Sequence, residues 1–419
     1  MITDQIKAKI NETKFLINDN YPLKIRDKIN HKVYSIPIEF LRYNDLNGRI
    51  ASFVESSKAV GEPLHYDTSK KTIEEYLWNS DEKANKNTKK SISEDGQQRP
   101  GIISADGIVL DGNRRLMLLN KLFEETGDSK FSRFNTIILD ESFTEKEIYD
   151  LEGYLQFGID PQAEYKPIEK YLMVNRRIKA GMTPKEISKS VNERFKEKEI
   201  IEFYEMFNLM DEYLDYIGSK GNYELLSFRK VEDSIKTLNS QIKKLQKNSH
   251  SSQKKWDVGN DEITDMKLIY FDLIRLAVSS DTKDYRQLVS SNGNLLEFKD
   301  EWKKFSDTHF EITKDIKIKS MELYETINKS PNSSKLSNLE KIKQVETSLE
   351  DYYKKELYGN LQNSIRTIEF IKSNNSTLNE LKAIHTKLLK VIEEYDENMV
   401  NKDGIHKYVS MIYGLLEEF

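Results

Sequence analysis

The sequence predicts an α+β fold at the N-terminal end, followed by a helix-turn-helix-like region and an all-α C-terminal part. Short β-branched runs between turn residues lie within about the first 140 residues, mixed with runs of helical spacing. Beyond about residue 141, apolar residues recur mainly at the three- and four-residue steps of amphipathic helices. The length of 419 residues exceeds one ordinary core, so we expect several domains.

Local patterns predict each element of the α+β part. Asp106-Gly107 separates two β-branched runs, which is a strong signal for a hairpin turn. A helix is expected next, because Leu116, Leu119 and Phe123 fall on one helical face. In chain order we expect a strand with a helical turn at 32–50, an exposed polar loop at 79–90, a hairpin at 102–112, a helix at 113–123 and a strand at 134–140.

Two helices joined by a short turn are expected at 183–217, a pattern that is typical of a helix-turn-helix. Thr183, Pro184 and Glu186 predict the start of the first helix. Threonine caps the helix, proline suits its first position, and the glutamate completes a capping box. Residues 246–262 and 329–338 are polar and are expected to be linkers or long loops.

Two apolar series predict a helical hairpin or bundle at the C-terminal end. The first series runs from Leu339 to Ile368 and the second from Leu378 to Tyr395, with polar residues 373–376 between them. A sustained heptad zipper is less favoured, because the spacing drifts and the charges are not placed consistently. The predicted domains are 1–165, 166–235, 236–330 and 331–419.

Composition and charge exclude several classes of protein. The absence of cysteine excludes disulfides, thiolate metal sites and cysteine nucleophiles, and the net charge of −5 disfavours a uniformly basic surface. The six histidines are scattered, so no metal site is predicted. No apolar run suits a signal sequence or a membrane span, so we expect a cytoplasmic protein with no membrane partner. Its many Lys, Asn and Ile residues are typical of a low-GC bacterium.

The stretch "IVLDGNRRLMLL" at 108–119 places two arginines between a predicted strand and a predicted helix. The first amides of a helix have no partners within it, and its dipole makes that end partly positive, so such a seam is a ready anion site. An arginine there adds a planar fork for phosphate oxygens. The alternative is an ion pair between one arginine and a carboxylate such as Asp111, with the other arginine in solvent.

Three segments, in this order, resemble the N-terminal domain of the ParB family, which has the ParB/sulfiredoxin fold. They are residues 34–49, 90–119 and 154–174, and the resemblance covers about residues 32–215. The middle segment is the most specific, since it ends in the family's glycine and double arginine. The resemblance implies a nucleotide pocket, DNA as a partner, and a nucleoside triphosphate with Mg²⁺ as the cofactor.

The same resemblance implies a set of nucleotide-binding residues. The phosphate cradle, the wall beside it and the arginine of the first segment are Arg49, Gly96, Gln97, Pro100, Gly112, Asn113, Arg114 and Arg115.

The chain departs from the family pattern at two places. Asn113 replaces the usual glutamate, and the third segment has Glu152 and Gln156 but lacks the metal-binding asparagine. These departures favour nucleotide binding over magnesium-dependent CTP hydrolysis. Sulfiredoxin activity is excluded, because it requires a cysteine. A related phage-defence group carries Asp-Gly-Gln-Gln-Arg where this chain has Asp-Gly-Asn-Arg-Arg, which keeps an enzyme open as an alternative.

Basic residues outside the seam predict a nucleic-acid contact. Residues 228–255 contain eight basic and two acidic side chains, and such a patch can follow a phosphate backbone. A solvated helix face is an equally good interpretation. The candidate contacts are Arg176, Arg177, Lys179, Arg229, Lys230, Lys243, Lys244 and Lys247.

Three functions remain open from the sequence. The first is a nucleotide-binding, DNA-associated protein, in which the nucleotide controls a switch. The second is an NTPase or nuclease, in which Arg115 neutralises phosphate charge and Asp111, Glu94 or Glu152 holds a metal or acts as the base. The third is a scaffold, in which the helical half from residue 260 binds a protein partner or a second copy.

Overall fold

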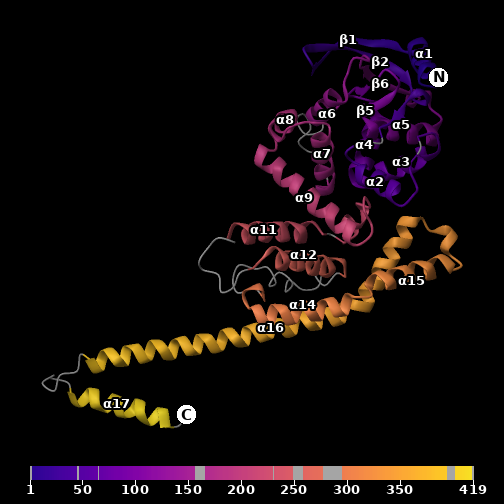
Figure 1. Cartoon of the computed structure of the whole chain (residues 1–419). Helices are drawn as coiled ribbons and strands as arrows, with labels where there is room; N and C mark the ends of the chain where they lie inside the picture. The colour runs from indigo at the N-terminus through magenta and orange to yellow at the C-terminus, as the bar shows by residue number, and fades with distance from the viewer. Residues whose placement is uncertain are drawn as a thin grey trace.

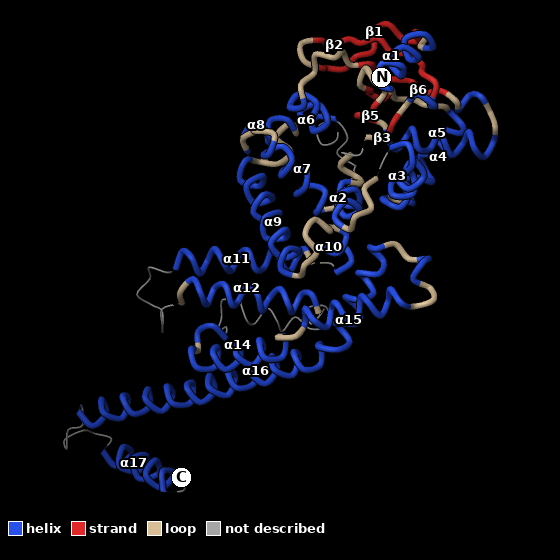
Figure 2. Tube along the Cα trace, turned by 45° about the vertical axis from the view of Figure 1, so that its right-hand side comes forward, coloured by secondary structure: helices blue, strands red, loops and turns tan. Residues whose placement is uncertain are grey.

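The computed structural model describes residues 2–44, 47–64, 66–155, 166–229, 231–248, 258–276, 295–393 and 402–417. Strands lie at the N-terminal end of the molecule and helices make up the rest, as Figure 2 shows. The expected order, a mixed α+β part followed by a largely helical part, is therefore confirmed. No helix in the described ranges is long and apolar enough to cross a membrane.

The N-terminal sheet is mixed and has the strand order β1-β2-β6-β4-β5-β3. Pairs β1/β2, β2/β6 and β4/β5 are antiparallel, whereas β4/β6 and β3/β5 are parallel. The strands are β1 (Phe15–Ile25), β2 (Lys28–Pro37), β3 (Arg42–Tyr43), β4 (Gly101–Ile103), β5 (Ile108–Asp111) and β6 (Arg133–Ile138). The hairpin predicted around Asp106-Gly107 is β4–β5, and Gly107 supplies the positive φ of its turn.

Both faces of this sheet are covered by helices. Ile103 and Val109 belong to the larger core with α1–α5, whereas Ile102 and Leu110 pack on the opposite side with Leu151 of α6. Neighbouring strand residues therefore serve different cores, as the alternation along a strand requires. The helices are α1 (Ile2–Thr13), α2 (Ala51–Ala59), α3 (Tyr66–Ser80), α4 (Glu82–Asp95), α5 (Asn113–Thr126) and α6 (Glu145–Gly153), with short 3-10 turns at Ile38–Phe40 and Ser129–Phe131.

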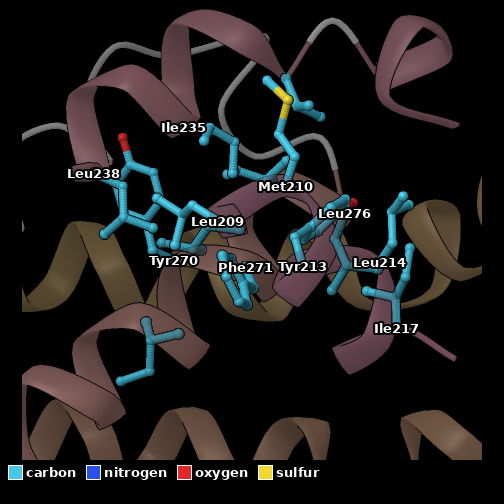
Figure 3. Packing of buried hydrophobic residues seen from close by; sticks show 14 of the residues in the cluster. Leu209, Met210, Tyr213, Leu214, Ile217, Ile235, Leu238, Tyr270, Phe271 and Leu276 are labelled. Atoms are coloured by element: carbon cyan, nitrogen blue, oxygen red, sulfur yellow. The ribbon is translucent and has the colours of Figure 1, made fainter. Parts of the chain in front are cut away.

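The rest of the described chain is helical, and most of its helices share one large apolar core (Figures 1 and 3). Apart from Ala51 of α2, the buried residues of this core lie between Ile168 and Ile368. The helices are α7 (Pro167–Lys179), α8 (Pro184–Ser190), α9 (Glu197–Tyr216), α10 (Glu224–Arg229), α11 (Glu232–Asn248), α12 (Asn260–Arg275), α14 (Lys299–Thr313), α15 (Ile316–Lys329), α16 (Asn338–Glu393) and α17 (Lys402–Glu417), with short 3-10 turns at Leu295–Glu297 and Ser333–Lys335. Helix α8 instead packs in a smaller cluster with Tyr149, and α17 contributes no residue to either cluster.

The predicted pair of helices at 183–217 is present as α8 and α9. Thr183 caps α8 in the expected capping box with Glu186, and Asn192 adopts the positive φ of the turn between the two helices. The predicted loop at 329–338 is also present between α15 and α16. Most of the predicted linker at 246–262 lies outside the described residues.

Two predictions about local structure are wrong. The polar run at 79–90 is mostly helix, because Asp81 caps α4 and Asn85 and Ile92 bury one narrow face against the neighbouring helices. The expected break at 373–376 is also absent, since these residues continue α16 for all of its 56 residues. Four polar residues in a row do not end a helix when neither glycine nor proline accompanies them.

A candidate anion pocket at the start of helix α5

The strand-to-helix seam has the form that the sequence predicts. Strand β5 ends at Asp111, Gly112 adopts a left-handed conformation with φ 98°, and α5 begins at Asn113. Gly112 offers no side-chain cap, and no acidic residue lies in the first turn. The first amides of α5 therefore keep their capacity to bind an anion.

The seam is held in place by close packing of the backbone against the ring of Phe134. The buried ring of Phe134 on β6 lies so near to β4 and the seam that an added Cβ would come within 2.3 Å of it at Gly101 and 2.9 Å at Gly112. A Cβ at Gly112 would also meet Arg115 Nη2 at 3.0 Å. Both glycines are thus required by space, and Gly112 also by its φ.

A cavity of about 280 Å³ opens at this seam. Four arginines and one carboxylate, Asp111, are among the described residues that line it. The arginines come from the loop before α2, from the loop after α4 and from the first turn of α5, and they are Arg49, Arg99, Arg114 and Arg115. Polar and apolar side chains complete the lining, namely Asn47, Thr88, Ser91, Ile92, Gln97, Gln98, Asn113 and Leu155.

Arg115 lies beside Gly112 and lines the cavity. Its Nη2 donates to Asp111 Oδ2 at 2.7 Å and to the carbonyl oxygen of Pro100 at 3.3 Å. Its Nε is buried and has no hydrogen-bond partner among the described residues. The ion pair with Asp111, which was the alternative to phosphate binding, is therefore present. It still leaves one donor of Arg115 unused.

Arg114 and Arg99 differ in how they are held. Arg114 Nε donates to Asn85 Oδ1, and its Nη2 lies 3.5 Å from Asp81 Oδ2. Arg99 is exposed, and it forms no ion pair within the described ranges. The cavity thus combines fixed cations with one that can turn towards a ligand.

The loop between α4 and β4 is fixed to the sheet by Gln97. Its Nε2 donates to the carbonyl oxygens of Arg99 and Asn135, and its Oε1 accepts from the amide of Asn135. Gly96 ends α4 with φ 74°. Gln97 is therefore a structural residue of the predicted wall, and it places Arg99 at the cavity.

Asn113 connects the seam to β3 and α6 and does not point a free amide at a ligand. Its Nδ2 donates to the Val109 carbonyl, and its Oδ1 accepts from the Asn44 amide. Asn44 Nδ2 in turn donates to Glu152 Oε1 at 2.7 Å. A buried chain of hydrogen bonds therefore runs from the cavity to α6.

Glu152 is buried behind this chain and does not line the cavity. Burial raises its pKa from 4.5 to about 7, and the cation of Arg177 acts in the opposite direction. Glu94 is exposed on α4, 3.9 Å from Lys90, and it does not line the cavity either. Neither carboxylate therefore occupies the catalytic position that the sequence suggested.

The residues around the cavity do not fit a protein-held magnesium ion. Asp111 is the only carboxylate among the lining residues described, and Arg115 already engages it. Within the described ranges no group of three or more acidic or histidine side chains is placed to hold a metal.

The predicted nucleic-acid contacts do not form one exposed set. Arg177 is buried and donates to the Tyr149 carbonyl oxygen, so it cannot reach a phosphate backbone, and that prediction is wrong. Arg176 pairs with Glu55, and Lys243 pairs with Glu205. Lys179 and Lys244 are exposed. The side chains of Arg229, Lys230 and Lys247 lie outside the description.

Sequence reasoning missed Arg99, Gln98 and the hydroxyl-bearing Thr88 and Ser91. A signal for the first two existed, because residues 95–99 themselves read Asp-Gly-Gln-Gln-Arg. Thr88 lies in the run 79–90, whose prediction as a loop gave no reason to place its side chain at a site.

The molecule is thus defined as an α+β module with an arginine-lined cavity, joined to a long helical region. No family model matches the sequence, and no curated protein matches it. A solved structure, described as the C2221 form of a Pnob8-like ParB-N domain, matches 66% of this chain and 97% of its own length, with 15% identity and a TM-score of 0.32. It belongs to the family that the motifs resemble. At these values the match carries no argument about ligand or activity.

Proposed function

We propose that this protein binds a phosphate-bearing ligand, a nucleotide, in the cavity at the start of α5. The observation that carries the proposal is that four arginines and one aspartate line a cavity onto which an uncapped helix N-terminus opens. Cations in the first turn of a helix oppose its dipole. Arg114 and Arg115 lie there beside Asp81 and Asp111, and the four arginines of the lining outnumber these two carboxylates. A bound phosphate would supply further negative charge.

The wall of the cavity has features that suit the rest of a nucleotide. Thr88 and Ser91 offer hydroxyl groups and Ile92 and Leu155 offer apolar surface, all within one cavity. Small-ligand sites commonly combine apolar walls with a few polar groups in this way. The phosphates would contact the arginine side, and the sugar or base the remaining lining.

A titration with nucleotides tests this proposal. The purified chain is titrated with pyrophosphate, CTP, ATP and GTP, each with and without Mg²⁺, and binding is followed by calorimetry and by thermal shift. We expect binding without added metal, and at least tenfold weaker binding in Arg99→Ala, because a charge-assisted hydrogen bond contributes about 1.5–3 kcal/mol.

A matched control is Lys90→Ala. Lys90 is an exposed cation on α4 outside the cavity lining, so its loss should leave binding unchanged. Equal affinity of the parent chain and Arg99→Ala for every ligand would contradict the proposal. Equal losses of affinity in Arg99→Ala and Lys90→Ala would show that binding depends on overall charge and not on the cavity.

We do not propose α9 as a DNA-reading helix. It occupies the second position of the helix-turn-helix-like pair, yet it carries seven acidic residues and one lysine. A recognition helix in the major groove lies between phosphate backbones, so this charge opposes it. Association with DNA through other surfaces remains a separate prediction, which short duplex DNA in the same titration would test.

A further inference from the structure

Helix α2 meets the helical region through a buried cluster of polar side chains. Ser52 and Ser56 of α2 are fully buried, and Glu169 of α7 and Glu224 of α10 are at most 5% exposed. Figure 2 shows α2 close to both of these helices. A buried carboxyl group is costly unless cations or hydrogen-bond donors satisfy it. Both carboxyl groups therefore need partners inside the protein.

A single hydroxyl group lies between the two carboxyl groups. Ser52 Oγ is 2.6 Å from Glu169 Oε1 and 3.1 Å from Glu224 Oε1. A serine hydroxyl carries one hydrogen, and an ionised carboxylate carries none. Ser52 can therefore donate to only one of the two groups. The other contact has a hydrogen only if a carboxyl group supplies it.

The neighbouring donors are already used. The amide of Ser52 donates to the second oxygen of Glu169, Oε2, at 3.3 Å. Ser56 Oγ donates its hydrogen to the Ser52 carbonyl oxygen at 2.7 Å and accepts from the Glu224 amide at 2.9 Å. Ser56 therefore has no hydrogen left for either carboxylate.

The charges around the cluster balance one carboxylate more closely than the other. The charged and titratable side chains near it are Glu55 of α2, Tyr76 of α3, Lys166 and Arg176 at either end of α7, and Lys343 of α16. Lys343 Nζ lies 3.9 Å from Glu224 Oε2, whereas Arg176 is paired with Glu55 at 3.1 Å. The two carboxyl groups are within about 6 Å of one another across Ser52, where like charges oppose ionisation.

The titration of Glu169 agrees with this geometry. Burial raises the pKa of Glu169 from 4.5 to about 7, although both hydrogen bonds with Ser52 and the cations of Arg176 and Lys166 act in the opposite direction. Near neutral pH the group therefore exchanges a proton readily.

We propose that a proton on Glu169 holds α2 against α7 and α10, and that loss of this proton releases the helix. In the held state Glu169 Oε1 donates to Ser52 Oγ, Ser52 donates to Glu224, and Lys343 balances the charge of Glu224. Ionisation of Glu169 leaves two buried carboxylates facing one hydrogen. The contact between the α+β part and the helical region is thus sensitive to pH.

Hydrogen exchange of the full chain tests this proposal without any ligand, so its outcome is independent of nucleotide binding. The protection factors of the α2 amides are compared between the parent and Glu169→Gln at about pH 5 and about pH 8.5. The glutamine mimics the protonated acid, because its side-chain amide can donate to Ser52 Oγ and accept from the Ser52 amide without ionising. The contribution of Glu152 is present in both proteins and cancels.

We expect the α2 amides of the parent to lose protection by tens of times relative to Glu169→Gln as the pH rises. The contribution of the proton is complete below about pH 4.5 and is lost as the pH rises through 7. A pKa of about 7 in the held state and 4.5 in the released state permits a change of at most about 300-fold.

Two further variants support the comparison. Glu75→Gln removes an exposed glutamate from α3, whose Tyr76 stacks on Phe53 of α2, and it should behave as the parent. Glu224→Gln removes the like charge across Ser52, so the pH dependence of α2 protection should shrink. This second variant carries the test if Glu169→Gln does not fold.

Two results would overturn the proposal. The first is an equal pH dependence of α2 protection in the parent and in the variant that cannot ionise. The second is equal protection of the α2 amides and the buried amides of α5, which shares a core with α2. In that case α2 would open only together with the rest of the α+β part, and no separate release would exist.

Discussion

The tripeptide Asn-Arg-Arg occurs twice in this chain, and the two copies lie at opposite ends of their helices. Residues 113–115 form the first turn of α5, whereas residues 175–177 lie near the end of α7. A cation opposes the helix dipole at the first position and is stabilised by it at the second. The same three residues therefore form an open cavity in one region and a closed contact in the other.

The asparagines of the two copies are both buried, but the arginines are used differently. Each of Arg115 and Arg177 has a buried Nε without a hydrogen-bond partner among the described contacts, but only Arg115 lines the cavity. Arg177 is 2% exposed and lies within the field of Glu152. The comparison teaches that the helix end, and not the motif alone, decides whether an arginine pair can meet a ligand.

The largest effect is expected from Arg177→Ala. This variant removes a buried cation and the hydrogen bond to Tyr149, and it takes from Asp150 and Glu152 the cation that acts on each of them most strongly. Breaking a buried charge pair costs about 3–5 kcal/mol. Urea unfolding measures the loss. Arg176→Ala serves as the control. An equal loss of unfolding free energy in both variants would show that burial of Arg177 has no special role.

The next effect concerns the pH dependence set by Glu152. Its pKa is raised by burial from 4.5 to about 7, so the folded state holds the proton more tightly than the unfolded chain. The contribution of this group to stability is complete below about pH 4.5 and is lost as the pH rises through 7.

Glu152→Gln keeps an acceptor for Asn44 and removes the titration. Relative to the parent, its free energy of unfolding should increase from about pH 5 to about pH 8 by up to about 3 kcal/mol. Urea unfolding at both values measures the difference. A constant difference between the two proteins would show that Glu152 titrates normally.

A smaller effect is expected at the seam from Gly112→Ala. The positive φ and the close approach to Phe134 strain an alanine by about 1–3 kcal/mol. Because the change also displaces Arg115, nucleotide binding should weaken together with stability. Gly181→Ala is the matched control, since Gly181 has a similar φ and open space around it. Equal binding by the parent and Gly112→Ala would contradict the cavity as the site.

The smallest effect is expected from Lys179→Ala, in the last turn of α7. An exposed cation at a helix C-terminus contributes about 0.3–1 kcal/mol, so thermal unfolding should change only slightly. Nucleotide binding should not change at all. A loss of binding would place the ligand near α7 and contradict the comparison between the two pairs.

The seam could be predicted from the sequence because its signals are local. The β-branched run, Gly112 and the apolar spacing after Asn113 each specify backbone geometry within a few residues. The role of Arg177 could not be predicted, because burial depends on the packing of α6 against α8 and on contacts distant in the chain. Strand β1 and helix α4 also escaped prediction, since exposed strands and polar helices lack a strong apolar period.

Helix α16 begins at a joint with the cavity-bearing region. The amide of Asn338 donates to Glu62 and its side chain donates to the Val60 carbonyl, just after the end of α2. Helix α2 in turn directly follows the loop that carries Arg49. A helix of 56 residues is about 84 Å long, so a tilt of about 5° at this joint displaces the far end by about 7 Å. If α2 and this joint moved together, the length of the helix would turn a small movement at α2 into a large one at its far end.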